Sequence, residues 1–114
     1  MMDARFLRNE MLWGKEGQAR LARAHVILFG LGGVGSYVAE CLARSGIGEL
    51  TLVDGDTVAL SNLNRQLEAL TSTIGLPKAE AIARRIAEIN PEAVLHPMQA
   101  LYNADNRALF FPEG

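Results

Sequence analysis

The sequence predicts a Rossmann-like α/β fold, a doubly wound parallel sheet truncated to about its first half, with three parallel strands and flanking helices. Three observations predict it. A glycine-rich segment, Gly30 to Ser36, follows an apolar run and opens into a helical pattern. A second apolar run ends at Asp54, 19 residues after Gly35. Helical and strand patterns then alternate once more along the rest of the chain.

The first predicted elements are a helical leader and a strand. Residues 5–23 have a helical pattern that two glycines interrupt. The five residues His25 to Phe29 form a short apolar run, which is typical of a buried strand when a turn follows it.

The glycine-rich segment is typical of a loop that holds phosphate between a strand and a helix. Without a Cβ, one glycine can take a positive φ, another lets phosphate approach the backbone, and a third lets helix and strand pack closely. The free N–H groups of the helix that follows face the anion. We therefore divide the chain into a helical leader, residues 1–24, and a partial nucleotide-binding domain, residues 25–114.

The helix after the loop is predicted to bury one apolar stripe against the sheet and to end at Ser45-Gly46. The stripe consists of Val34, Val38, Cys41 and Leu42. On this interpretation Cys41 is a core residue and has no catalytic role.

The remaining elements follow in order. Residues 50–53 form the second strand, residues 54–74 a polar loop, residues 77–89 a helix with isoleucines at helical spacing, residues 93–99 the third strand, and residues 105–111 a short helix. The loop is long for a compact domain, and loops of that length are usually functional. Right-handed crossovers between the strands give a parallel sheet with helices on its faces.

Composition excludes several classes of protein. The 114 residues are 49% hydrophobic and 21% charged, which is ordinary for a globular domain. The formal net charge of −2 gives no overall basic footprint for nucleic acid. No apolar run is long enough for a membrane span, and the single cysteine fits a cytoplasmic protein.

The histidines His25 and His96 flank strands without a further ligand, so no metal site is predicted. The pair Arg84 and Arg85 is predicted to be solvated.

Three polar residues around the long loop suggest a site for a nucleotide. Asp54 leaves the carboxyl end of a strand, where a carboxylate can hold a ribose. Arg65 can bind phosphate oxygens in a forked geometry. Lys78 lies in the first turn of a helix, where a bound anion would relieve its conflict with the helix dipole. Each has an ordinary alternative: a turn cap for Asp54, a surface ion pair with Glu68 for Arg65, and a solvated side chain for Lys78.

The glycine loop, the stretch LVDGDTVALSNLNRQ and the segment IGLPK together resemble the ThiF/MoeB/HesA superfamily of adenylating enzymes, which are related to ubiquitin activators. The resemblance covers residues 5–107, and the SNLNRQ block is its most specific part. Within the superfamily the chain is most similar to the tRNA threonylcarbamoyladenosine dehydratases. Three features favour that branch: GVGS in the loop, NRQ after it and the leader RFLRNEMLWG.

The resemblance implies ATP and Mg²⁺ as cofactors. By motif, the residues that approach the phosphates are Gly30, Gly32, Gly33 and Gly35. Asp54 would hold the ribose, and Asn62, Arg65, Gln66 and Lys78 would surround the triphosphate. Arg8 matches an arginine that reaches the triphosphate from a partner subunit, which implies a homodimer. The resemblance also implies tRNA as a partner, since the activated carboxylate would be that of a modified tRNA adenosine that cyclises with loss of water.

Other functions stay open at this point. One is adenylation of the C-terminus of a ubiquitin-like sulfur carrier; another is an NAD-dependent oxidoreductase; a third is a non-catalytic nucleotide-binding module. The superfamily places a Mg²⁺-binding aspartate after its fourth strand, and this sequence reaches Gly114 before one. We therefore expect the chain by itself to be inactive.

Overall fold

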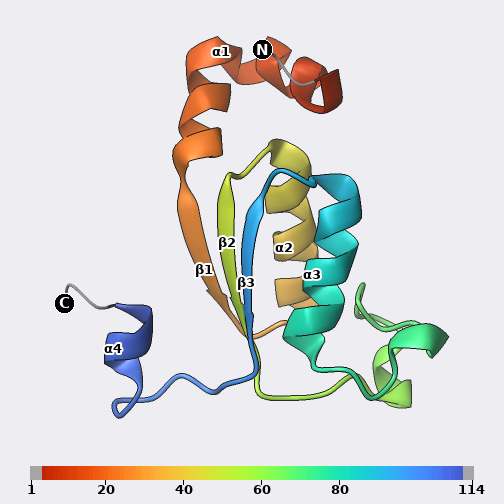
Figure 1. The fold of residues 1–114 in the computed structure, drawn as a ribbon. Coiled ribbons are helices and arrows are strands. Elements are labelled where there is room, and N and C mark those ends of the chain that lie inside the picture. The colour runs from red at the N-terminus through yellow and green to blue at the C-terminus, as the bar shows by residue number, and fades with distance from the viewer. Residues whose placement is uncertain (1–3, 112–114) are drawn as a thin grey trace.

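The structure, a computed structural model, describes residues 4–111. Its centre is a three-stranded parallel sheet in the order β1-β2-β3, which confirms the predicted fold class. The strands are β1 (His25–Phe29), β2 (Glu49–Val53) and β3 (Val94–Met98). They are connected by α2 (Gly33–Ser45) and α3 (Lys78–Ile89). Both connecting helices lie on the same face of the sheet (Figure 1), because two right-handed crossovers in one direction place them there.

Side chains alternate between the two faces of the sheet. On the helix-covered face, Val26, Leu50 and Leu95 lie side by side in the parallel register and pack into the main core. On the opposite face, the neighbouring row begins with His25 and Glu49. The core therefore forms between the sheet and one helical layer, and neither α2 nor α3 covers the other face (Figure 1).

The predicted inward stripe of α2 is wrong except at Leu42, which packs against the main core. Val34 is 80% exposed and Cys41 is also exposed, whereas the buried residues of this helix are Ser36, Ala39 and Ala43. Small residues face the sheet because the helix starts close to β1. Cys41 is therefore not a core residue.

The α2–α3 pair is tied by a charged contact. Arg85 of α3 donates a short hydrogen bond to the Glu40 carboxylate of α2, and this interaction holds the pKa of Glu40 below its ordinary value. The prediction that both arginines are solvated is wrong for Arg85, because an ion pair between helices holds it. Arg84 does lie exposed, at 2.9 Å from Glu80 one helical turn before it.

The leader forms α1 (Leu7–Arg23), preceded by a 3₁₀ turn at Ala4–Phe6. It is kinked at Gly14, whose φ is 77° and ψ 170°. The helix lies at the amino ends of the strands (Figure 1) and contributes no buried residue to the described core. Two side chains of α1 donate hydrogen bonds to the end of α2: Asn9 to the Arg44 carbonyl and Gln18 to the Ser45 carbonyl. The first three residues of the predicted leader, 1–3, and the last three of the predicted nucleotide-binding domain, 112–114, lie outside the described residues.

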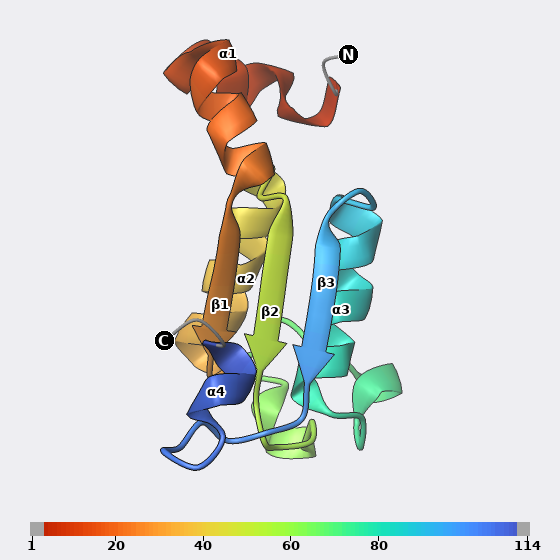
Figure 2. The same cartoon turned by 60° about the vertical axis from the view of Figure 1, so that its left-hand side comes forward.

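The carboxyl ends of the strands carry the long loop and a short helix, α4 (Arg107–Phe110), within the predicted range. Phe110 stacks edge-on against Phe29 with ring centroids 5.4 Å apart, and Tyr102 lies 4.8 Å from the same ring. This aromatic cluster ties α4 to the end of β1, on the side of the sheet opposite to α2 and α3 (Figure 1 and Figure 2). Within residues 4–111, no helix is long and apolar enough to cross a membrane.

Candidate functional site

The glycine loop and Asp54 meet at the carboxyl ends of β1 and β2. Gly30 has a φ of 92°, which a side chain would disfavour, and its N–H donates to the Val53 carbonyl at 2.8 Å. The next amide, of Leu31, donates to Asp54 Oδ2 at 2.7 Å. Asp54 Oδ1 accepts the Asp56 amide at 2.8 Å. The Asp54 carboxylate is thus fixed against the loop, while it also caps a turn as the alternative interpretation expected.

Helix α2 begins two residues after Leu31, whose amide contacts this carboxylate, and Gly32 is its N-cap. In the described chain, no side chain caps that end of the helix. A Cβ on Gly35 would come 2.0 Å from the Gly30 carbonyl oxygen, so glycine is required for this close approach of helix and strand. The first amides of a helix lack internal partners and favour an anion. The start of α2 therefore offers backbone N–H groups that no side chain caps.

The polar loop after β2 folds back over the glycine loop. The Leu67 amide donates to the Ser36 hydroxyl at 3.4 Å, which ties the two segments together. Gln66 is buried, and its amide nitrogen would lie 3.8 Å from a Cβ at Gly32. Its Oε1 atom is buried without a hydrogen-bond partner among the described residues. Gln66 therefore lies beside the loop with an unused acceptor.

Arg65 lies over the start of α2, with its aliphatic carbons 3.9 Å from where a Cβ of Gly33 would be. Its Nη1 atom donates to the Ser61 carbonyl and to Asn64 Oδ1, both at 3.0 Å. The alternative ion pair with Glu68 does not form in the described part of the chain. Arg65 is exposed and close to the glycine loop, as a phosphate ligand would be.

Asn62 has a role within the loop. It is buried, and its Oδ1 atom accepts the Ala59 amide at 2.8 Å, which closes the turn Leu60–Asn62. Because this oxygen is engaged in the turn, we expect Asn62 to shape the loop in addition to any contact with a ligand.

Lys78 is only 7% exposed, so the alternative of a solvated lysine is wrong. It is the first residue of α3, and its backbone N–H donates to the Asp56 carbonyl at 3.0 Å. Within residues 4–111, its ammonium has no carboxylate in ion-pair contact. A bound anion could take the place of such a partner and would relieve the conflict of this cation with the helix dipole.

Glu68 is a site residue that the sequence interpretation missed. It is 1% exposed, and neither carboxylate oxygen has a hydrogen-bond partner in the described structure. Burial raises the pKa of Glu68 to about 6; the positive charge of Lys78 opposes this rise and the negative charge of Asp54 adds to it. No pattern predicts this burial, because Glu68 stands in a polar loop.

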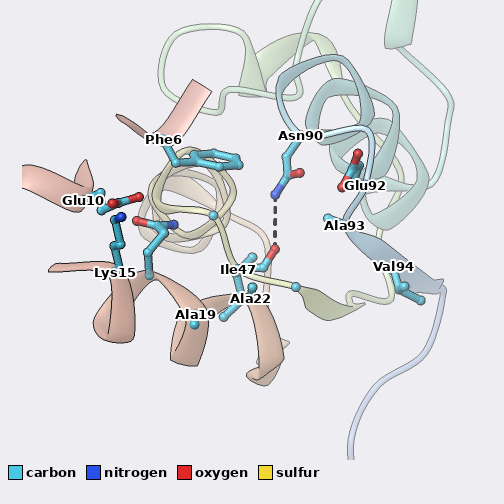
Figure 3. Close-up of a pocket in the computed structure, with 13 residues that line it drawn as sticks. Phe6, Glu10, Lys15, Ala19, Ala22, Ile47, Asn90, Glu92, Ala93 and Val94 are labelled. Atoms are coloured by element: carbon cyan, nitrogen blue, oxygen red, sulfur yellow. Dashed lines mark hydrogen bonds between the residues drawn. The ribbon is translucent and has the colours of Figure 1, made fainter. Parts of the chain in front are cut away.

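A hollow of about 280 Å³ lies at these strand ends, lined among others by Gly30, Asp54 and Tyr102. A larger cavity, of about 650 Å³, lies at the opposite end of the sheet, between the leader and the amino ends of the strands (Figure 3). Asn90 and Phe6 line it, and Asn90 donates to the Ile47 carbonyl at 3.1 Å. No predicted site residue lines this larger cavity. We therefore place the candidate site at the carboxyl ends.

Arg8 does not join the other predicted residues. It lies exposed on α1, which Figure 1 shows at the amino ends of the strands, whereas the glycine loop and the start of α3 lie at the carboxyl ends. Within one chain, Arg8 is separated from the site by the length of the sheet.

The two histidines lie within strands, on the uncovered face of the sheet, with ring centroids 5.9 Å apart. His96 is 2.6 Å from Glu49, and His25 is 2.7 Å from the Thr51 hydroxyl. In the described residues, no group of three or more His, Cys, Asp or Glu side chains is arranged to hold a metal ion.

The sheet order, the glycine loop and the carboxylate after the second strand define an α/β protein of the Rossmann-like class. More particularly, the chain belongs to the ThiF family, which its sequence matches over residues 6–113. This match confirms the predicted resemblance.

The individual relatives agree. The chain is 48% identical over 109 residues to the tRNA threonylcarbamoyladenosine dehydratase of Bacillus subtilis (strain 168), covering 96% of this chain and 43% of that protein. It is 40% identical over 98 residues to the molybdopterin-synthase adenylyltransferase of Escherichia coli (strain K12), covering 86% and 39%.

Among solved structures, the chain is similar to the E. coli tRNA N6-threonylcarbamoyladenosine dehydratase in complex with ATP. The TM-score is 0.92 at 44% identity, over 96% of this chain and 45% of that one. The chain thus spans less than half the length of these relatives.

Proposed function

We propose that the protein to which this chain belongs activates a carboxylate with ATP, and that this carboxylate is borne by tRNA threonylcarbamoyladenosine, which then cyclises with loss of water. The observation that carries the proposal is that the glycine loop, Arg65 and Lys78 meet at the carboxyl ends of the strands, where Lys78 is 7% exposed and makes no ion pair within the described residues. The identity to a tRNA threonylcarbamoyladenosine dehydratase over nearly the whole chain supports the choice of substrate.

The residues fit a nucleoside triphosphate. The uncapped start of α2 offers backbone N–H groups to phosphate oxygens, at Gly32 and the glycines beside it. Asp54 is fixed where it can accept a ribose hydroxyl. Arg65, beside Gly33, and Lys78, at the start of α3, supply positive charge, and the Gln66 side-chain amide nitrogen beside Gly32 can donate to a phosphate oxygen. A triphosphate would thus accept hydrogen bonds from these donors and from the first amides of α2.

The proposed reaction needs positive charge more than it needs a protein base. The substrate carboxylate, already ionised, attacks the α-phosphorus; its new P–O bond replaces the bond to pyrophosphate, which leaves. Arg65 and Lys78 would neutralise charge that develops on the transferring and leaving oxygens. Mg²⁺, when bound, would supply further neutralisation on the phosphates. Attack within the substrate on the activated carbonyl then expels AMP and closes the ring.

Arg8 can act only from a second copy of the chain. Its helix lies at the opposite end of the sheet from the glycine loop (Figure 1), so an arginine from the same chain does not reach the triphosphate. We propose a homodimer in which Arg8 of each copy approaches the site of the other.

An alternative within the same class is adenylation of the C-terminus of a ubiquitin-like sulfur carrier. The 40% identity to a molybdopterin-synthase adenylyltransferase supports this alternative, at lower identity and coverage than the dehydratase.

Pyrophosphate exchange into ATP tests the proposed function in the protein at its full natural length. We expect exchange with tRNA that carries threonylcarbamoyladenosine and none with a sulfur-carrier protein. Arg65→Ala should reduce exchange by about 10²–10³-fold, because a charge-assisted contact to the transition state is lost. Arg84→Ala, which removes an exposed arginine of α3 from a surface pair, is the matched control and should leave the rate unchanged.

Three results would contradict this assignment. Exchange with the carrier protein alone would support the alternative substrate. Wild-type exchange in Arg65→Ala would remove that residue from the mechanism. Tighter binding of NAD than of ATP, measured by calorimetry, would favour an oxidoreductase.

A further inference from the structure

Glu68 stands out because a buried carboxyl beside a phosphate site is unexpected. The residue is 1% exposed, and both oxygens lack hydrogen-bond partners among the described residues. An ionised carboxylate in such surroundings costs free energy, since water no longer solvates it, and the backbone N–H of Glu68 offsets only part of that cost. The sequence assigns it no role in holding the nucleotide.

The backbone around Glu68 holds the side chain in place. The Thr73 hydroxyl donates to the Glu68 carbonyl at 2.6 Å, and the following amide, of Ala69, donates to the Gln66 carbonyl at 3.0 Å. Ala69 packs with Val58 in a small apolar cluster. These contacts fix the backbone from which the Glu68 side chain projects, and that side chain is 1% exposed.

Two charged groups from the elements around it act on the Glu68 carboxyl: the Lys78 ammonium, from the start of α3, and the Asp54 carboxylate, from the end of β2. Lys78 is the cation that offsets the charge of Glu68, and it is also the cation proposed to receive phosphate. A bound triphosphate would therefore take up the compensating charge of Lys78 and add negative charge nearby.

We propose that Glu68 takes up a proton when ATP binds, so that nucleotide binding is linked to protonation of this buried carboxyl. The inference rests on the proposed function, because it requires phosphate beside Lys78. In the free protein, burial already raises the pKa of Glu68 to about 6, so the group is mostly ionised at pH 7.5. The negative charge of the triphosphate would raise this pKa further, because it disfavours a second negative charge nearby.

Proton uptake on binding makes the affinity for ATP depend on pH. Since the ATP-bound form binds more protons, ATP affinity falls as pH rises above 6, by at most tenfold per pH unit for one proton. Below pH 6 the carboxyl is protonated in both forms, and this contribution disappears. The substitution Glu68→Gln keeps the shape of the side chain but removes its charge and its proton, so the variant should bind ATP more tightly than wild type at pH 8.

Calorimetry of ATP binding at pH 7.5 in two buffers with different heats of ionisation tests the proposal in the protein at its full natural length. We expect wild type to take up a larger fraction of a proton per ATP than Glu68→Gln does. The terminal phosphate of ATP also titrates in this range, but its contribution is common to both proteins. A thermal melt of Glu68→Gln establishes that the variant is folded.

The outcomes separate the two proposals. ATP binding with the same proton uptake in both proteins would overturn the role of Glu68 and leave the proposed function intact. The absence of ATP binding in both folded proteins would overturn the proposed function, and this inference with it. A lower proton uptake in Glu68→Gln, with tighter binding at pH 8, supports both.

Discussion

Two buried charged side chains lie close to each other in the sequence. Glu68 belongs to the polar loop that covers the glycine loop, and Lys78 begins α3 just after that loop. Neither makes an ion-pair contact within the described residues, and the buried carboxyl of Glu68 is costly to ionise. Such costs are common at functional sites, where a ligand completes the set of partners. The structure thus places a cation ready for an anion and a carboxyl that is easily protonated in one small region.

The raised pKa of Glu68 makes a prediction about stability. The pKa is about 6 in the fold against an ordinary value of 4.5, so the folded state favours the protonated acid. The stability that this preference contributes is present below pH 4.5 and is lost as pH rises to 6. At pH 7, Glu68→Gln should therefore be more stable than wild type by up to about 2 kcal/mol, at 1.36 kcal/mol per pKa unit.

Denaturant unfolding of both proteins between pH 4 and 8 measures this difference. The two free energies of unfolding should converge near pH 4.5. A difference that does not change with pH would show that the charge of Glu68 has no part in it.

At the scale of elements, the start of α2 is the feature on which the site depends. This helix packs on the sheet through Ser36, Ala39 and Ala43, and it approaches β1 so closely that Gly35 has no room for a side chain. That close approach directs the first amides of the helix over the ends of the strands. The glycine loop therefore has a packing requirement in addition to its proposed binding role.

A pair of glycine substitutions tests the packing requirement at Gly35. In Gly35→Ala the new Cβ would meet the Gly30 carbonyl at 2.0 Å, and we expect a loss of about 1–3 kcal/mol in unfolding free energy. Gly33→Ala is the matched control, since its Cβ would lie 3.9 Å from the nearest atoms, those of Arg65. The control should melt within a few degrees of wild type. Equal melting temperatures for both variants would contradict the packing requirement at Gly35.

The elements that the sequence predicts well are those with clear ends. The run His25–Phe29 is apolar and closed by a glycine, and the structure places β1 on those same residues. The buried face of α2 was predicted wrongly because Val34 and Ser36 both fit a helical repeat, and hydrophobicity favoured the valine. Which face turns inward depends on the distance to β1, a tertiary property.

Part of the candidate site could be predicted because some of its residues stand at the ends of regular elements. Asp54 and Lys78 follow or begin regular elements, so topology brings them to one edge of the sheet. The burial of Glu68 arises from the folded shape of an irregular loop, which no periodic pattern encodes.

For the whole molecule, the arrangement of layers is one-sided. Both α2 and α3 cover one face, whereas the row His25, Glu49 and Val94 lies on the other face, which neither helix covers (Figure 2). In the described residues, β1 pairs with β2 alone, so its outer edge has unpaired backbone groups. Exposed strand edges and apolar faces of this kind recruit other chains.

We therefore expect the 114-residue chain by itself to self-associate, either through the leader that carries Arg8 or edge to edge through β1. Light scattering at micromolar concentration should give a mass above 12.4 kDa. Ile27→Lys, which places a charge on the uncovered face of the edge strand, should reduce association if β1 is the contact. A stable monomer for the wild-type chain would contradict this prediction.

The agreement between chain order and strand order has a consequence for synthesis on the ribosome. Each strand pairs with the strand that precedes it in the chain, so β1, α2 and β2 can assemble as soon as they emerge. The third strand then adds to an edge that already exists. We infer that Leu50 and Leu52, in the central strand, are sheltered early, before the segments that complete the nucleotide site have been translated.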